Sequence, residues 1–176
     1  MSAAEDRIAF DLLLQMPGGF EPSDIWVLGC GTGAHAALLA RRRPDAMVHG
    51  LEAHEALLNQ ARARPERVDW VSGEAEDFSP ATPPDLIFSA AAWSARANHK
   101  ALMPRLFRAL KPGGVLACAV RSTPGGPDMA DYHHWLSPGA AEMLVWKTAY
   151  FEAPEVSPDL ELQIGPPAYI FVIARR

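Results

Sequence analysis

Short apolar runs alternate with stretches of helical period between residues 24 and 120. Apolar runs bounded by turn residues predict buried strands, and apolar residues spaced three and four apart predict amphipathic helices. The predicted strands are 24–28, 46–51, 67–71, 85–89 and 115–120, and the predicted helices between them are 34–43, 54–64 and 98–110. Because strands joined by helices run parallel, this pattern predicts an α/β fold with helices on both faces of the sheet.

The two ends of the chain complete this prediction. Residues 5–16 have the period of an amphipathic helix that ends at the Pro-Gly-Gly run 17–19. Near the other end, residues 144–151 and 169–174 resemble strands, and the proline-rich segment 152–167 between them contains no helical pattern. Strands joined without a crossover helix pair antiparallel. The pattern therefore predicts a mostly parallel sheet that ends in an antiparallel hairpin.

Composition and charge exclude several classes of protein. The chain is 49% hydrophobic and 21% charged, which is typical of a globular domain, and no apolar stretch is long enough to cross a membrane. Its first residues lack the basic and apolar regions of a secretory signal. Cys30 and Cys118 are too few for a disulfide framework and wrongly spaced for a zinc site, so we expect a cytoplasmic protein without a metal.

The net charge of −5 argues against nucleic acid as a partner, because such partners require a basic face. Two groups of arginines stand out, residues 41–43 and residues 62, 64 and 67. Both follow the ends of predicted helices, where cations complement the helix dipole, and we interpret them as solvated.

A glycine-rich turn, Gly29-Cys30-Gly31-Thr32-Gly33, joins the first predicted strand to a helix. Glycines allow a tight turn and close approach to a ligand, and Glu52 ends the next strand, where a carboxylate binds the hydroxyls of a ribose. The run could also be only a tight turn, or a dinucleotide fingerprint in which Ala34 takes the last small position. A helix before the first strand and a final pair of helix-free strands argue against a dinucleotide domain.

Motifs along almost the whole chain resemble those of class I S-adenosylmethionine-dependent methyltransferases, and within them the trans-aconitate 2-methyltransferase-like proteins. The matching segments are 28–33, 50–52, 73–75, 85–89, 102–106, 110–116, 145–150 and 171–176. Together with the strand pattern, the resemblance implies a Rossmann-like seven-stranded sheet of order 3-2-1-4-5-7-6, with strand 7 antiparallel. It also implies one domain over residues 1–176: an N-terminal helix (1–23), a cofactor-binding core (24–120), and a reduced cap with a C-terminal hairpin (121–176).

The resemblance also implies S-adenosylmethionine as the cofactor. The turn carrying Gly29, Cys30, Gly31 and Gly33 would hold its methionine part, and Glu52 its ribose. Glu74 and Ala75 would bind the adenine through a side chain and a backbone N–H, respectively. Ser89 and Ala90 would lie close to the sulfonium and its methyl group.

Several positions depart from the family pattern. Val27 stands where the first strand usually carries an acid that braces the turn, and Ala34 and Ala90 replace polar residues. The segments that cover the substrate in trans-aconitate-type enzymes are shortened here to 121–143 and 152–167. The implied function is methyl transfer to a small molecule, with a carboxylate as one possible acceptor. The alternative is a non-catalytic binding or regulatory module that keeps the fold.

An acceptor other than a carboxylate requires a general base. The candidates are Tyr132, His133 and His134 in the shortened cap and His99 after the fourth strand, although histidines in an exposed loop are often simply solvated. We interpret Cys30 as a small side chain that fills space in the glycine-rich turn rather than as a nucleophile. Two tryptophans, Trp93 and Trp135, could line an acceptor pocket or belong to the core.

Overall fold

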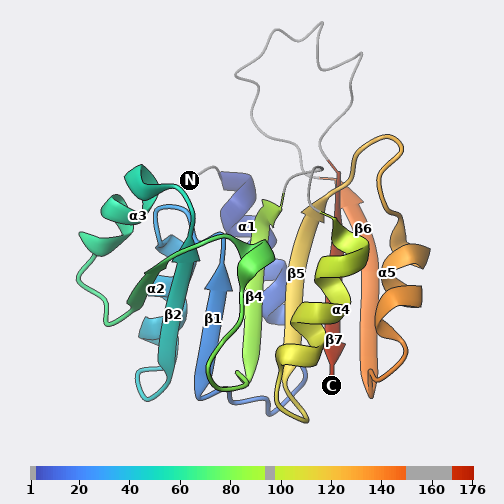
Figure 1. The fold of residues 1–176 in the computed structure, drawn as a ribbon, viewed down its shortest axis with the longest axis horizontal. Helices are drawn as coiled ribbons and strands as arrows, with labels where there is room; N and C mark the ends of the chain where they lie inside the picture. Colours follow the sequence, from blue (N-terminus) through green and yellow to red (C-terminus); the bar gives the residue numbers. More distant parts are fainter. Residues whose placement is uncertain (1–2, 94–97, 150–167) are drawn as a thin grey trace, which may run out of the picture.

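Seven strands form one mixed sheet flanked by helices in the computed structural model of the protein (Figure 1), which describes residues 3–93, 98–149 and 168–176. The strands are β1 (Asp24–Leu28), β2 (Met47–Glu52), β3 (Asp69–Ser72), β4 (Leu86–Trp93), β5 (Val115–Arg121), β6 (Glu142–Ala149) and β7 (Ala168–Arg175). The helices are α1 (Ala3–Leu14), α2 (Ala34–Arg42), α3 (Glu55–Arg62), α4 (His99–Ala109), α5 (Met129–Leu136) and the 3₁₀ turn η1 (Ala75–Asp77).

The strand order is β3-β2-β1-β4-β5-β7-β6, as predicted. β1 pairs parallel with β2 and with β4, and β4 pairs parallel with β5. β7 runs antiparallel to both β5 and β6, with Ala117 of β5 opposite Ile173. The predicted topology is confirmed, including the antiparallel seventh strand. The proline-rich segment 152–167, predicted to be a loop, lies outside the described residues.

Strand residues point alternately to two apolar layers. Val27, Phe88 and Phe171 face the layer that includes Ile8 of α1 and Leu39 of α2. Their neighbours along the strands, such as Leu28 and Ile87, face the layer built with α4 and α5. α1 and α2 therefore cover one face of the sheet, and α4 and α5 cover the other (Figure 1). None of the helices in the described residues is long and apolar enough to cross a bilayer.

Helix α5 lies within residues 121–143, where the sequence predicts a shortened cap with His133 and His134 in a loop. Asp128 accepts a hydrogen bond from the backbone N–H of Asp131, and the Asp131 side chain accepts one from the N–H of Asp128. This reciprocal capping box satisfies N–H groups that a helix start leaves unpaired. Tyr132 and Leu136 then bury one side of the helix. The Asp-x-x-Asp spacing was the sequence signal for this helix.

Asp85 holds the amino ends of three strands together. One of its carboxylate oxygens accepts hydrogen bonds from the N–H and hydroxyl of Ser23 and from the N–H of Asp24, at 2.7–3.0 Å. The other oxygen lies 3.0 Å from Nζ of Lys111, in the turn before β5. Burial opposes ionisation of Asp85, but these donors outweigh it and hold the pKa of the carboxyl below its usual value.

The Asp85→Asn variant should lose roughly 1–3 kcal/mol of unfolding free energy near neutral pH, because charge-assisted hydrogen bonds and the pairing with Lys111 are lost. A carboxyl whose pKa is lowered by folding stabilises the protein above its unfolded pKa, near 3.8, and loses that effect as the pH falls further. The difference between variant and wild type should therefore shrink in acid. Urea titrations at neutral pH and at about pH 3 measure both effects. Asp45→Asn, at an exposed position, is the control, and equal stability of Asp85→Asn and wild type at neutral pH would contradict the assignment.

Candidate cofactor site

The order of the strands places a topological switch point at the carboxyl ends of β1 and β4, and we call this place the β1–β4 crevice. β2 and β3 lie to one side of β1, and β4 and β5 lie to the other, so the direction of winding reverses between β1 and β4. Open α/β sheets bind ligands at such a point. Ser89 is fully buried here, and its hydroxyl donates a 3.0 Å hydrogen bond to the carbonyl oxygen of Leu28. Ser89 therefore joins the two strands that border the crevice.

The glycine-rich turn after β1 needs glycine for two different reasons. Gly29, Gly31 and Gly33 all have positive φ angles, between 55° and 80°. A Cβ added at Gly33 would lie 2.4 Å from the indole of Trp70 and 2.9 Å from Cβ of Ala61, so Gly33 also allows the start of α2 to pack closely. A Cβ at Gly31 would meet no atom within 4 Å. The turn is thus packed at Gly33 and open at Gly31, as expected of a cradle for a ligand.

Glu52, the last residue of β2, connects the loops that follow three strands. Its Oε2 accepts a 2.8 Å hydrogen bond from the N–H of Gly31, and its Oε1 accepts a 2.9 Å hydrogen bond from the N–H of His54. Its backbone carbonyl accepts a bond from Gly73, directly after β3. Each carboxylate oxygen can accept more than one hydrogen bond. Glu52 can therefore brace the turn and still accept hydrogen bonds from a vicinal diol.

Arg64 braces the same turn from outside the sheet. Its Nε donates a 2.6 Å hydrogen bond to the carbonyl oxygen of Thr32. We had interpreted Arg64 as a solvated helix end, and the structure shows that this was wrong. Val27, which stands in place of the usual acid, is 2% exposed and belongs to the apolar layer under the turn. Glu52 and Arg64 thus hold the turn without a carboxylate at position 27.

The comparisons with known proteins agree with this geometry. Residues 25–114, more than half of the chain, match the family described as a methyltransferase domain. The trans-aconitate 2-methyltransferase of Azoarcus sp. (strain BH72) is 34% identical over 82% of this chain, and that of Methylobacterium radiotolerans is 36% identical over 82%. The chain belongs to the class I S-adenosylmethionine-dependent methyltransferases. It spans 67% of the length of each of these two relatives.

Solved structures of methyltransferases share the fold. An S-adenosylmethionine-dependent methyltransferase from Mesorhizobium loti superposes with a TM-score of 0.70 at 17% identity, covering 98% of this chain and all of that one. The plantazolicin methyltransferase BpumL in complex with SAH superposes with a TM-score of 0.65 at 13% identity, covering 99% and 83%. The family to which our chain belongs uses S-adenosylmethionine, and this is the cofactor of the chain. The open turn at Gly31 and the braced Glu52 carboxylate fit such a ligand.

The segment after β3 carries the two residues predicted to bind adenine. Glu74 is exposed and Ala75 is 9% exposed at the start of η1, where the N–H of Asp77 donates to the carbonyl of Glu74. Gly73 ties this segment to Glu52, so it lies beside the glycine-rich turn. Ala90, half-buried on β4, follows Ser89 at the other border of the crevice.

Cys30 lies inside the glycine-rich turn but is held as a thiol. It is 7% exposed, and a Cβ added at Gly50 would lie 3.1 Å from its sulfur. Burial, reinforced by the negative charge of Glu52, raises the pKa of the Cys30 thiol to about 12. A nucleophilic cysteine must be a thiolate. The environment of Cys30 therefore favours a role in packing over a role as nucleophile.

The structure brings together two of the four candidate bases. Tyr132 Oη and His99 Nδ1 lie 2.9 Å apart between α5 and α4, and the two residues are 1% and 3% exposed. Burial raises the pKa of the Tyr132 phenol above its usual value, which keeps it neutral. Trp135 stands edge-on to the Tyr132 ring at 5.3 Å and is half-buried, whereas the side chain of Trp93 lies outside the described residues. Tyr132 and His99 thus join two helices.

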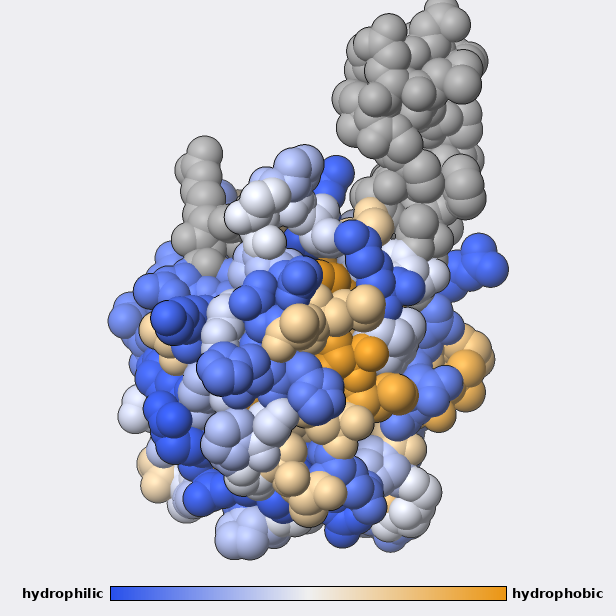
Figure 2. Space-filling view, turned by 90° about the vertical axis from the view of Figure 1, so that its right-hand side faces the viewer, coloured by the Kyte–Doolittle hydropathy of each residue, from blue (hydrophilic) through white to orange (hydrophobic). Residues whose placement is uncertain are grey.

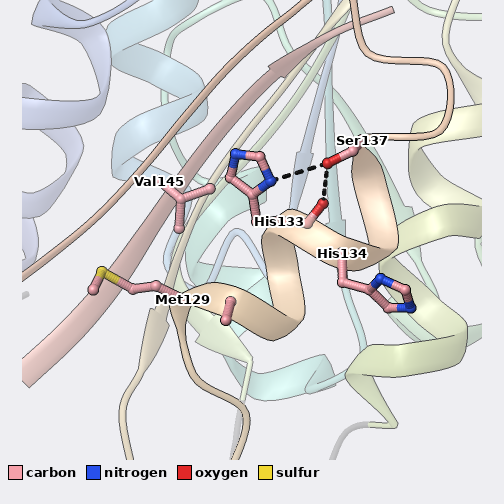
Figure 3. A pocket seen from close by; sticks show the side chains of 6 residues that line it. Met129, His133, His134, Ser137 and Val145 are labelled. Atoms are coloured by element: carbon pink, nitrogen blue, oxygen red, sulfur yellow. Dashed lines mark hydrogen bonds between the residues drawn. The ribbon is translucent and has the colours of Figure 1, made fainter.

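His133 and His134 lie apart from the crevice. They are exposed on α5, which packs near β6, three positions from β4 in the sheet. His133 pairs with Ser137 at 3.0 Å and, with Met129 and Val145, lines a groove of about 600 Å³ (Figure 3). Figure 3 shows the His133 ring beside Val145 and the His134 ring turned to the opposite side. Neither is placed to serve the β1–β4 crevice.

The same end of the molecule carries an apolar surface patch. Figure 2, which views the end of the sheet formed by β6 and α5, shows hydrophobic side chains surrounded by hydrophilic ones. Met129 of α5 and Leu144 of β6 are 42% and 43% exposed. Trp146 of β6 is instead partly buried and stacks on Phe171 at 4.6 Å.

Adding a methyl group at Gly33 (Gly33→Ala) should lower the free energy of unfolding by roughly 1–3 kcal/mol, because the new Cβ collides with the Trp70 ring and α2 must shift. Gly31→Ala is the matched control: it meets the same kind of backbone strain but open space, and we expect the smaller loss of the two. Denaturant unfolding without ligand measures both. Equal losses at the two positions would show that packing against Trp70 is not what requires Gly33.

Proposed function

We propose that this methyltransferase transfers a methyl group from S-adenosylmethionine to a carboxylate of a small organic acid. The observation that carries the proposal is the likeness, at 34% and 36% identity over most of the chain, to enzymes named for methylating trans-aconitate, a tricarboxylic acid. The proposal is also supported by the exposed Arg121 at the carboxyl end of β5 and by the chemistry of the reaction.

Each part of the cofactor has residues suited to it in this proposal. The turn from Gly29 to Gly33 holds the methionine part, and Glu52 accepts hydrogen bonds from the two ribose hydroxyls. Glu74 and the N–H of Ala75 bind the adenine. Ala90 lies beside the sulfur, and the buried Ser89 holds the crevice wall through its bond to Leu28 rather than by reaching the ligand.

S-adenosylmethionine, when bound, supplies an electrophilic methyl group on a positively charged sulfur. A carboxylate is ionised at neutral pH and attacks without losing a proton, so the protein has to orient it and to exclude water. This suits the positions of the candidate bases, because His99 and Tyr132 are buried against each other and His133 and His134 face outward. Arg121, exposed at the carboxyl end of β5 beside β4, offers a cation to the acid.

The second candidate function is a binding or regulatory module that keeps the cofactor site without catalysis. The replacement of family side chains by Val27, Ala34 and Ala90 favours it. Both functions require that the protein binds the cofactor, but only the first includes transfer of the methyl group.

Glu52→Ala should weaken binding of S-adenosylhomocysteine by roughly 1.5–3 kcal/mol, on the order of ten- to a hundredfold in Kd, because charge-assisted hydrogen bonds to the ribose are lost. Isothermal titration calorimetry measures the change. Glu55→Ala, an exposed acid on α3 that pairs with Arg62, is the control and should bind like the wild type. An unchanged affinity of Glu52→Ala would mean that the ribose is held elsewhere.

Incubation with methyl-labelled S-adenosylmethionine and a panel of di- and tricarboxylic acids should give labelled products that lose their label as methanol in mild alkali, since methyl esters hydrolyse there. Initial rates should change little with pH above the carboxyl pKa values of the acceptor, because no proton is removed. Base-stable label on an alcohol or amine acceptor would overturn the carboxylate assignment. Tight binding of S-adenosylhomocysteine with no turnover of any acceptor would support the binding module instead.

A further inference from the structure

Arg105 of α4 holds the segment that follows β3. Its Nη1 donates a 3.0 Å hydrogen bond to the carbonyl oxygen of Phe78, and its Nη2 donates to the carbonyls of Ala75, at 3.1 Å, and of Glu76. One half-buried guanidinium therefore binds three carbonyls, two of them in η1 and one in the residue that follows it. A guanidinium presents its donors in a rigid fork, so it fixes the orientation of the peptides it binds.

Within the part of the chain that the structure describes, the other hydrogen bonds of this segment use neither the Glu74 side chain nor the N–H of Ala75. At the end of η1, the N–H groups of Asp77 and Phe78 already donate to Glu74 and Ala75. Phe78 is 6% exposed and stands edge-on to Trp26 of β1 at 5.0 Å. The carbonyl side of the turn is thus fixed by Arg105 and Phe78. The exposed Glu74 side chain and the N–H of Ala75 belong to the first residues of the same turn.

We propose that Arg105 is a positioning residue for recognition of the adenine base: by holding the carbonyls of η1, it sets the N–H of Ala75 and the carboxylate of Glu74 at the spacing that adenine requires. This inference rests on the proposed binding of adenine by Glu74 and Ala75. Arg105 itself does not touch the cofactor. Its loss therefore affects discrimination between bases more than binding of the rest of the ligand.

The test compares two probes that differ only in the base. S-inosylhomocysteine carries a carbonyl oxygen where S-adenosylhomocysteine carries the exocyclic amine, and its ring nitrogen N1 carries a hydrogen. It therefore matches neither the Glu74 carboxylate at the exocyclic position nor the N–H of Ala75 at the ring nitrogen. The wild type should bind the adenosyl compound at least about tenfold more tightly, because a site built around a donor rejects an analogue that lacks it. Calorimetry on the full chain gives both Kd values.

Arg105→Gln should lower the affinity for S-adenosylhomocysteine by about tenfold and that for S-inosylhomocysteine by less than about twofold, which removes most of the discrimination. Arg105→Lys, which keeps the charge but not the fork, should lie between Arg105→Gln and the wild type. Arg108→Gln is the matched control on the same helix, because Arg108 is exposed, and it should change neither Kd.

A double-mutant cycle separates positioning from a purely structural role. Glu74→Ala should itself remove most of the discrimination, and adding Arg105→Gln to it should change the ratio of the two Kd values little, because both act on the same contact. Equal loss of affinity for the two probes in Arg105→Gln would overturn the proposal. If Arg105→Gln fails to fold, Arg105→Lys alone decides by the same ratio.

The same measurements distinguish a failure of the proposed function from a failure of this inference. A wild type that binds neither probe contradicts the cofactor site itself. A wild type that binds both with equal affinity contradicts adenine recognition by Glu74 and therefore this inference, while leaving Glu52 and the glycine-rich turn as the binding elements. Amide hydrogen exchange without ligand adds an independent readout, since Arg105→Gln should speed exchange in residues 73–78 and Arg108→Gln should not.

Discussion

The Glu52 carboxylate is the point on which the rest of the site depends. It stands at the end of β2, and its two oxygens accept backbone hydrogen bonds from Gly31 and His54 while its carbonyl accepts one from Gly73. The chain segments that follow β1, β2 and β3 are thereby held together by one residue. Hydrogen bonds to an ionised group are among the stronger ones in proteins, so a single carboxylate can fix this edge of the sheet and still bind a diol.

This arrangement bears on the departures from the family pattern. A carboxylate at position 27 would lie in the apolar layer under the turn, where Val27 is 2% exposed. The turn is braced instead from its outer side, by Arg64 on the Thr32 carbonyl, and from β2, by Glu52. The loss of one acid is therefore accompanied by other contacts that fix the same backbone. The valine at this position is therefore compatible with a formed cofactor site, and it favours a module without catalysis only in combination with Ala34 and Ala90.

The alternation of strands and helices predicted a parallel core and a final antiparallel pair of strands, because connection length decides whether neighbouring strands can run parallel. The order of the seven strands required the resemblance to the methyltransferase family as well. The positions of Glu52 and the glycine-rich turn followed from the same reasoning. Helix α5 was missed because its start is marked by two aspartates rather than by a serine or threonine with a glutamate. Arg64 and Arg105 could not be found, since each binds carbonyls about thirty residues away and no local pattern encodes such a bond.

The two arginines also explain how a site built mostly from backbone groups is kept in shape. Arg64 holds a carbonyl in the glycine-rich turn, and Arg105 holds three after β3, so both loops that face the crevice are fixed on the side away from it. Backbone N–H groups bind a ligand well only if the peptides carrying them do not have to reorient when the ligand arrives. The protein meets that requirement with charged side chains from α4 and from the end of α3. The buried pair of Tyr132 and His99 joins α4 to α5 on the same face, so it supports the helix that carries Arg105.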